Sequence, residues 1–180
     1  MDYQKIIDKY YPAGTLLRDI YMRHCRAVAG EAVSIARRNG LRLDESRIEA
    51  AAMLHDIGIF ATDAPSIQCH GTQPYIRHGI IGRDLLIEEG CPEDIAEVAS
   101  RHTGAGLTED DIRSQNLPLP AGDYCSRTML EKLVCYADKF YSKSGDMKRK
   151  PFDRVRASIA RFGSASLERF DAMAAIFGKE

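Results

Sequence analysis

The sequence lacks several features that mark common classes of protein. Its five cysteines are scattered and never form a C-x-x-C pair, which argues against a disulfide framework or a structural zinc site. Charged residues interrupt every apolar run well short of the ~18 residues that a membrane-spanning helix needs, and the first residues lack the basic start and apolar core of a signal peptide. We therefore expect reduced thiols, a cytoplasmic location and no membrane partner.

An excess of one charge is also missing. The formal net charge of -1 gives the chain no overall attraction for nucleic acid or anionic surfaces, so we expect no nucleic-acid partner. There is no internal repeat and no low-complexity tract. Any ligand must therefore be inferred from a local site.

The sequence does contain apolar residues spaced three and four apart, the pattern of amphipathic helices. Helices are predicted near residues 15–39, 44–55, 75–90, 92–102, 128–141, 153–162 and 166–177. Local signals support their ends, among them Thr15 as an N-cap, Gly40 after a last turn and Pro92 at a first helical position. No pair of alternating runs indicates a sheet, so we predict an all-α fold, a single-domain helical bundle.

Four histidines occupy the same kind of position on these helices. His24, His55, His78 and His102 each fall on the apolar face of a different predicted helix, and Asp138 falls on that of a fifth. One buried histidine is commonly satisfied by a backbone carbonyl, and an aspartate on a helix is usually exposed. Burying four imidazoles without partners would cost several kcal/mol in total. A shared metal ion would satisfy the imidazoles and the carboxylate together.

The pair His55-Asp56, followed by Ile57 and Gly58, resembles the signature of the HD superfamily of metal-dependent phosphohydrolases in its His-Asp-Ile-Gly variant. The family pattern also has a histidine one helix upstream and an aspartate on a late helix, and dinuclear members carry two more histidines in between. The residues named above stand in that order. The resemblance implies an HD-type helical domain at 15–145, with a helical extension at 1–14 and a second at 146–180 packed on the same domain.

The proposed ligands are imidazoles and carboxylates without a thiolate, a set that suits first-row transition metals. The resemblance implies that His24, His55, Asp56 and Asp138 hold one metal ion. In dinuclear relatives the aspartate matching Asp56 bridges, and the histidines matching His78 and His102 hold a second ion; in mononuclear nucleotidases that space belongs to the substrate. We expect one or two divalent ions per chain, iron or manganese first, with zinc, cobalt, nickel and magnesium as alternatives.

The activity that the resemblance implies is hydrolysis of a phosphate ester or anhydride of a nucleotide or another small phosphorylated molecule. A metal-bound hydroxide would attack the phosphorus atom, with His55, Asp56 and Lys139 as catalytic residues. Lys139 would bind a phosphate oxygen, and a place on a solvated basic edge is the alternative for this residue. Lys143 and the basic run 148–150 are interpreted as a solvated edge. The oligomeric state stays open, with a homodimer as one alternative.

Two other functions fit the same residues. Some dinuclear-iron HD proteins are oxygenases that cleave C–C or C–P bonds, and the ligands do not separate the two chemistries. A helical module that binds metal and nucleotide without turnover is the third reading. The irregular loop at 104–127 follows a proposed ligand, so we interpret it as a cover for the substrate.

Overall fold

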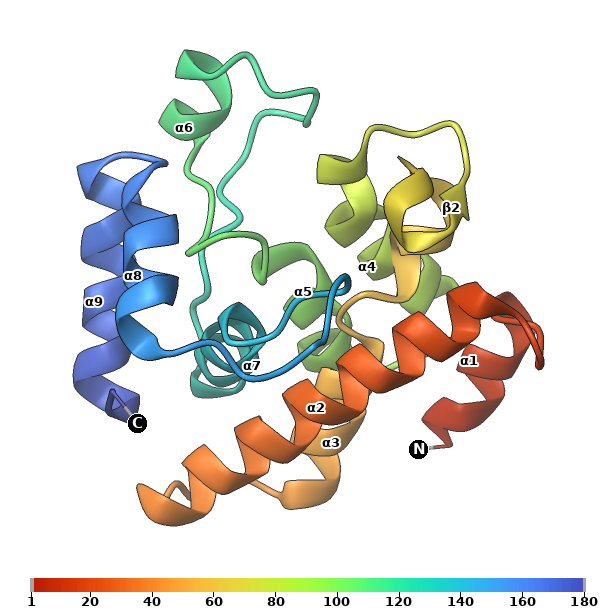
Figure 1. The fold of residues 1–180 in the computed structure, drawn as a ribbon, viewed down its shortest axis with the longest axis horizontal. Helices are drawn as coiled ribbons and strands as arrows, with labels where there is room; N and C mark the ends of the chain where they lie inside the picture. Colours follow the sequence, from red (N-terminus) through yellow and green to blue (C-terminus); the bar gives the residue numbers. More distant parts are fainter. Residues whose placement is uncertain (1, 180) are drawn as a thin grey trace.

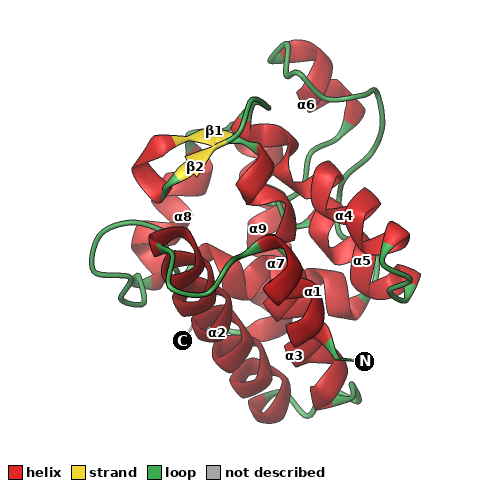
Figure 2. Cartoon of the chain, turned by 90° about the vertical axis from the view of Figure 1, so that its right-hand side faces the viewer, coloured by secondary structure: helices red, strands yellow, loops and turns green. Residues whose placement is uncertain are grey.

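The computed structural model describes residues 2–179 and confirms the all-α prediction (Figure 2). The α-helices are α1 (Tyr3–Tyr10), α2 (Leu16–Arg38), α3 (Glu45–Leu54), α4 (His78–Glu88), α5 (Glu93–Arg101), α6 (Glu109–Ser114), α7 (Met129–Lys139), α8 (Phe152–Ala160) and α9 (Ser164–Phe177). Three short 3-10 helices, η1 (Ile57–Ala61), η2 (Pro65–Ile67) and η3 (Tyr75–Arg77), join them. The strands of the described residues form one hairpin that the sequence did not predict, in which β1 (Asp63–Ala64) pairs antiparallel with β2 (Cys69–His70).

Side-chain caps start the principal helices where the sequence predicts them. The Thr15 hydroxyl accepts a hydrogen bond from the backbone N–H of Arg18 at the start of α2, and Asp44 accepts one from Ser46 at the start of α3. At the start of α7, Thr128 forms a reciprocal capping box with the side chain three residues further on. Each cap satisfies backbone donors that a helix leaves free at its first turn.

Two predicted helix starts are displaced. Pro92 is the cap residue of α5 and does not occupy its first turn, because its backbone is extended at ψ 137°. The helix expected directly behind Pro74 begins as the 3-10 turn η3 and becomes an α-helix only at His78. In that turn the carbonyl of Tyr75 accepts from both the backbone N–H and the ring Nδ1 of His78, which favours the tighter spacing of three residues.

The hydrophobic core runs through the bundle from α1 to α9. Figure 1 shows α2 crossing α3, with α7 and α5 packed beside this crossing and α8 and α9 side by side next to α7. The ring of Tyr11 stacks on Tyr21 at 4.1 Å between centroids, which joins the first loop to α2. The ring of Tyr136 in α7 packs against Phe170 and Phe177, which joins α9 to the same cluster of buried residues. The division into a domain with two extensions stays a prediction.

Gly58 allows the backbones of η1 and α4 to lie in direct contact. A Cβ atom there would lie 2.3 Å from the carbonyl oxygen of His78 and 2.5 Å from the backbone nitrogen of Gly82. The backbone of η1 therefore packs on the first turn of α4 with no room for a side chain. Glycine is required here because any side chain would force η1 and α4 apart. Their close approach brings Asp56 and His78 near each other.

Candidate metal centre

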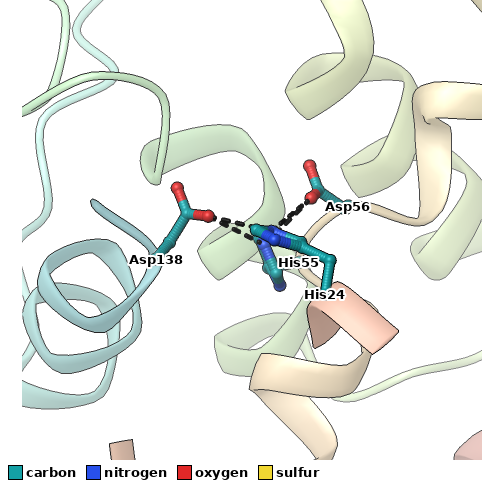
Figure 3. A group of neighbouring side chains, drawn as sticks. All are labelled: His24, His55, Asp56 and Asp138. Carbon is teal, nitrogen blue, oxygen red and sulfur yellow. Dashed lines mark ion pairs between the residues drawn. The ribbon is translucent and has the colours of Figure 1, made fainter. Parts of the chain in front are cut away.

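One group of four side chains converges from three helices (Figure 3). His24 comes from α2, His55 and Asp56 from the turn between α3 and η1, and Asp138 from α7. Nε2 of His24 lies 3.1 Å from Oδ2 of Asp56 and 3.0 Å from Oδ1 of Asp138. Nε2 of His55 lies 3.1 Å and 3.5 Å from the same two oxygens. One ligand atom from each residue fits within 4.8 Å of the others, which is compact enough for a single cation.

A second group shares the carboxylate of Asp56. The other oxygen, Oδ1, lies 3.5 Å from Nε2 of His78 and 3.4 Å from Nε2 of His102. The two imidazole nitrogens are 3.1 Å apart, and the three ligand atoms again fit within 4.8 Å. Asp56 therefore turns one oxygen to each group, the arrangement of a carboxylate that bridges two cations.

Backbone carbonyls orient three of the imidazoles. Nδ1 of His55 lies 2.6 Å from the carbonyl oxygen of Ala52, and His102 makes the same contact with Ala99 at 2.8 Å. Nδ1 of His78 lies 2.6 Å from the carbonyl oxygen of Tyr75, three residues earlier. A carbonyl accepts only, so Nδ1 must carry a proton, and Nε2 has the lone pair whenever the ring is neutral. Each ring is thus held in the tautomer that a metal ligand needs.

Several buried polar atoms of the first group have no hydrogen-bond partner within residues 2–179. They are both ring nitrogens of His24, Nε2 of His55 and both carboxylate oxygens of Asp56, although Oδ2 of Asp56 also lies within ion-pair distance of the Lys143 ammonium. An unsatisfied buried polar group costs about 1 to 3 kcal/mol, and a charged one costs more. A divalent cation would coordinate most of these atoms at once, so the residues present fit a metal site.

The charges of the centre hold its carboxylates ionised. Burial opposes the ionisation of Asp56, but the ammonium of Lys143 and the ring of His55 outweigh it and hold the pKa of this carboxyl well below its usual value. Burial likewise opposes ionisation of Asp138, and Lys139 next to it lowers the pKa of that carboxyl in the same way. Both aspartates are therefore anionic and ready to bind a cation at neutral pH.

The direction of the pKa shift differs between His55 and the imidazoles of the second group. Burial, helped by the neighbouring ring of His102, lowers the pKa of His78 to about 3, and burial also lowers the pKa of His102. In His55 burial acts in the same direction, but Asp56 beside it raises its pKa well above the usual value. The imidazoles of His78 and His102 are thus neutral at pH 7, whereas a cation that binds His55 competes with a proton.

The interpretation of Lys143 as part of a solvated edge is wrong. Its Nζ lies 2.6 Å from Oδ2 of Asp56, and its side chain is only 14% exposed. Lys139 is held nearby, 2.7 Å from Oδ2 of Asp138 and 2.8 Å from the carbonyl oxygen of His102. The basic run 148–150 is mixed, since Lys148 is exposed and Lys150 is half-buried.

A cleft of about 760 Å³ opens beside the centre. Its lining includes Asp138, Lys139 and Lys143 on the inner side, and residues of α8 on the outer side. The segment from β1 to η3 lines it as well, through Ala64 and Tyr75 among others. The loop 104–127, expected to cover the substrate, contributes no lining residue, and α8 stands in its place.

Other expectations concern the whole chain. All five cysteines are free thiols, as predicted. Within residues 2–179, none of the helices combines the length and apolarity that crossing a membrane requires.

The fold and the site together define a helical protein with a buried His/Asp cluster suited to divalent metal ions. The family model for the HD domain matches residues 21–142, and the chain belongs to this family. It is 36% identical over 120 residues to an uncharacterized protein of Methanocaldococcus jannaschii, an alignment that covers 65% of the chain and 63% of that protein.

Two further relatives carry a functional name. The chain is 33% identical over 124 residues to the tRNA (cytidine(56)-2'-O)-methyltransferase of Picrophilus torridus, covering 69% of the chain and 32% of that protein. It is 30% identical over 149 residues to the enzyme of the same name from Thermoplasma volcanium, covering 83% of the chain and 38% of that protein. The alignments thus span 32% and 38% of the two methyltransferases, far less than their full length. No solved structure matches it.

Proposed function

We propose that the protein is a metal-dependent phosphohydrolase with a dinuclear centre that acts on a small phosphorylated molecule, most simply a nucleotide. The observation that carries this proposal is the carboxylate of Asp56, whose two oxygens face two separate groups of imidazoles. A bridged pair of cations about 3.5 to 4 Å apart is the arrangement that two-metal hydrolases use.

In this proposal His24, His55 and Asp138 would hold one ion, His78 and His102 would hold the other, and Asp56 would contribute one oxygen to each. Ions bound there would lower the pKa of a bound water and neutralise charge on the phosphoryl oxygens. The protein supplies the orientation, because the carbonyls behind the histidines fix their rings before substrate arrives.

Two lysines complete the proposed site. Lys139 keeps Asp138 ionised and directed inward, and its contact with the carbonyl of His102 connects the two groups. Lys143 lines the cleft and contacts Asp56, so its ammonium lies between the carboxylate and the space open to substrate. Both are placed to bind non-bridging phosphate oxygens as point charges.

The character of the cleft supports an anionic substrate. Its lining includes five cationic side chains and one carboxylate, Asp138, which is already paired with Lys139. The two methyltransferase relatives are named for a reaction on tRNA, a polymer of nucleotides, which is compatible with a nucleotide substrate. Their alignment covers 32% and 38% of those proteins, so it supports no methyl transfer by this chain.

The test is a panel of nucleoside phosphates, dinucleoside polyphosphates and cyclic dinucleotides, assayed for hydrolysis without oxygen in the presence of Mn²⁺ or Fe²⁺. We expect anaerobic release of phosphate or mononucleotide, and loss of this activity in Asp56→Asn, whose amide keeps the shape of the side chain but not the charge. Turnover that requires oxygen would support the dinuclear-iron oxygenase instead. Binding of nucleotides without any turnover would support the non-catalytic module.

A further inference from the structure

The outer wall of the cleft carries three cations that lie outside the ion pairs of the described residues. Lys150, Arg154 and Arg161 line the cleft from the loop before α8, from α8 itself and from the residue that caps its C-terminus. None of the three forms an ion pair with a carboxylate of residues 2–179, since the ion pairs of this region involve other side chains. The wall therefore concentrates positive charge without an internal counter-ion.

A neighbouring arginine, Arg156, does have a carboxylate partner, so the lack of an ion pair distinguishes the face of α8 that lines the cleft. Arg156, two residues after Arg154, makes a two-pronged contact with Asp171 of α9 at 2.8 and 2.7 Å. Two residues on an α-helix point about 200° apart, so Arg154 and Arg156 lie on opposite faces. The face of α8 that packs on α9 has its charge neutralised, and the face towards the cleft does not.

The position of Lys150 is fixed although its charge is not compensated. Its backbone N–H donates to the carbonyl of Phe140 at 2.8 Å, which ties the loop to the end of α7. Burial lowers the pKa of its ammonium; Asp138 acts against this, and the nearby cations Lys139, Lys143 and Arg154 add to it. Crowded, half-buried cations of this kind are stabilised when an anion binds between them.

The helix that carries this wall is anchored by buried side chains. Val155 and Ile159, on the inner side of α8, are buried in the core, so the helix cannot move away from the cleft without exposing them. Cations held on such a helix are preorganised for a ligand.

We propose that Lys150 and Arg154 bind a second phosphate of the substrate, beyond the one at the metal centre, and that the protein thereby selects chains of two or more phosphates over monophosphates. This inference rests on the proposed function. Since α8 lies outside residues 21–142, the selecting residues belong to the part of the chain beyond the HD match. In this arrangement the reacting phosphate binds at the end of the cleft next to the metal centre. A further phosphate binds at the other end, between Lys150 and Arg154.

The test compares the wild-type protein with Lys150→Ala/Arg154→Ala, and uses Arg156→Ala as the matched control on the opposite face of α8. Adenosine triphosphate and adenosine monophosphate are the substrates, and calorimetric binding of inorganic tripolyphosphate and orthophosphate to the Mn²⁺-loaded protein is the second readout. Each lost charge-assisted contact is worth about 10-fold. We expect the double variant to lose about 100-fold in kcat/KM for the triphosphate and in affinity for tripolyphosphate. The values for the monophosphate and orthophosphate should change less than about 3-fold, and Arg156→Ala should match the wild type.

The outcomes separate this inference from the function on which it rests. Equal effects of the double variant on both phosphate lengths, or no effect, would overturn the inference while hydrolysis by the wild type still supports the proposed function. If the wild type hydrolyses nothing but its selective binding of tripolyphosphate depends on Lys150 and Arg154, the second phosphate site stands and the hydrolase fails.

Discussion

Replacement of Lys143 by methionine should destabilise the metal-free protein strongly. The Lys143 ammonium and the Asp56 carboxylate are 2.6 Å apart, in side chains that are 14% and 1% exposed. At this distance two unit charges attract by about 6 kcal/mol for an effective dielectric constant of about 20. Desolvation offsets part of this attraction, and removing one partner of a buried pair costs about 3 to 5 kcal/mol in practice. The isosteric methionine leaves the packing intact, so the loss is chiefly that of charge.

The assay is thermal unfolding in the presence of a chelator. For a chain of this size about 1 kcal/mol lowers the melting temperature by about 2 to 4 °C, so we expect a decrease of about 6 to 20 °C. Lys148→Met is the control, since the Lys148 side chain is 83% exposed, and it should change the melting temperature little. Mn²⁺ should reduce the difference between Lys143→Met and the wild type, because a cation beside Asp56 replaces the missing charge. A decrease under about 2 °C with chelator would refute the buried ion pair.

Two further perturbations test the close packing and the protonation of the site. In a urea titration, Gly58→Ala should destabilise the protein by about 1 to 3 kcal/mol, because its Cβ would lie 2.3 Å from the His78 carbonyl, and it should also impair metal binding at His78. The control Gly30→Ala, whose Cβ meets nothing within 4 Å in α2, should stabilise the protein by about 0.5 to 1 kcal/mol in the same titration. The pKa of His78 is lowered to about 3 in the folded protein, against about 6.5 in an unfolded chain. Between pH 6.5 and pH 3 this side chain therefore takes up a proton in the unfolded chain but not in the folded protein. The free energy of unfolding of the metal-free protein should therefore fall as pH decreases from 6.5, with up to about 1.4 kcal/mol per pH unit from this group, and His78→Gln should show a shallower slope.

The sequence predicts those parts of the fold that depend on local chemistry. Caps such as Thr15 and Asp44 act within three residues, so their effect is visible in the sequence itself. The inward positions of His24 and Asp138 follow from helical periodicity, because a side chain on an apolar face must turn to the core whatever packs against it. The order of these residues then indicates that they meet, and in the structure they do.

The features that the sequence does not predict depend on distant partners. Lys143 stands in a polar loop, and only the folded chain brings it to Asp56. The outer wall of the cleft is similar, since the charges of Arg154 and Arg156 look equivalent in sequence until α9 neutralises one of them. The β1–β2 hairpin has two residues in each strand, too few for an alternating pattern to be recognised.

The central claim is that Asp56 bridges two metal positions, and metal content tests it most directly. The measurement is elemental analysis of protein purified without oxygen or chelator, beside His78→Ala and Asp56→Asn. The account predicts two ions per chain in the wild type, about one in His78→Ala, and loss from both positions in Asp56→Asn. One ion in the wild type, unchanged in His78→Ala, would contradict the dinuclear centre and make His78 a substrate contact.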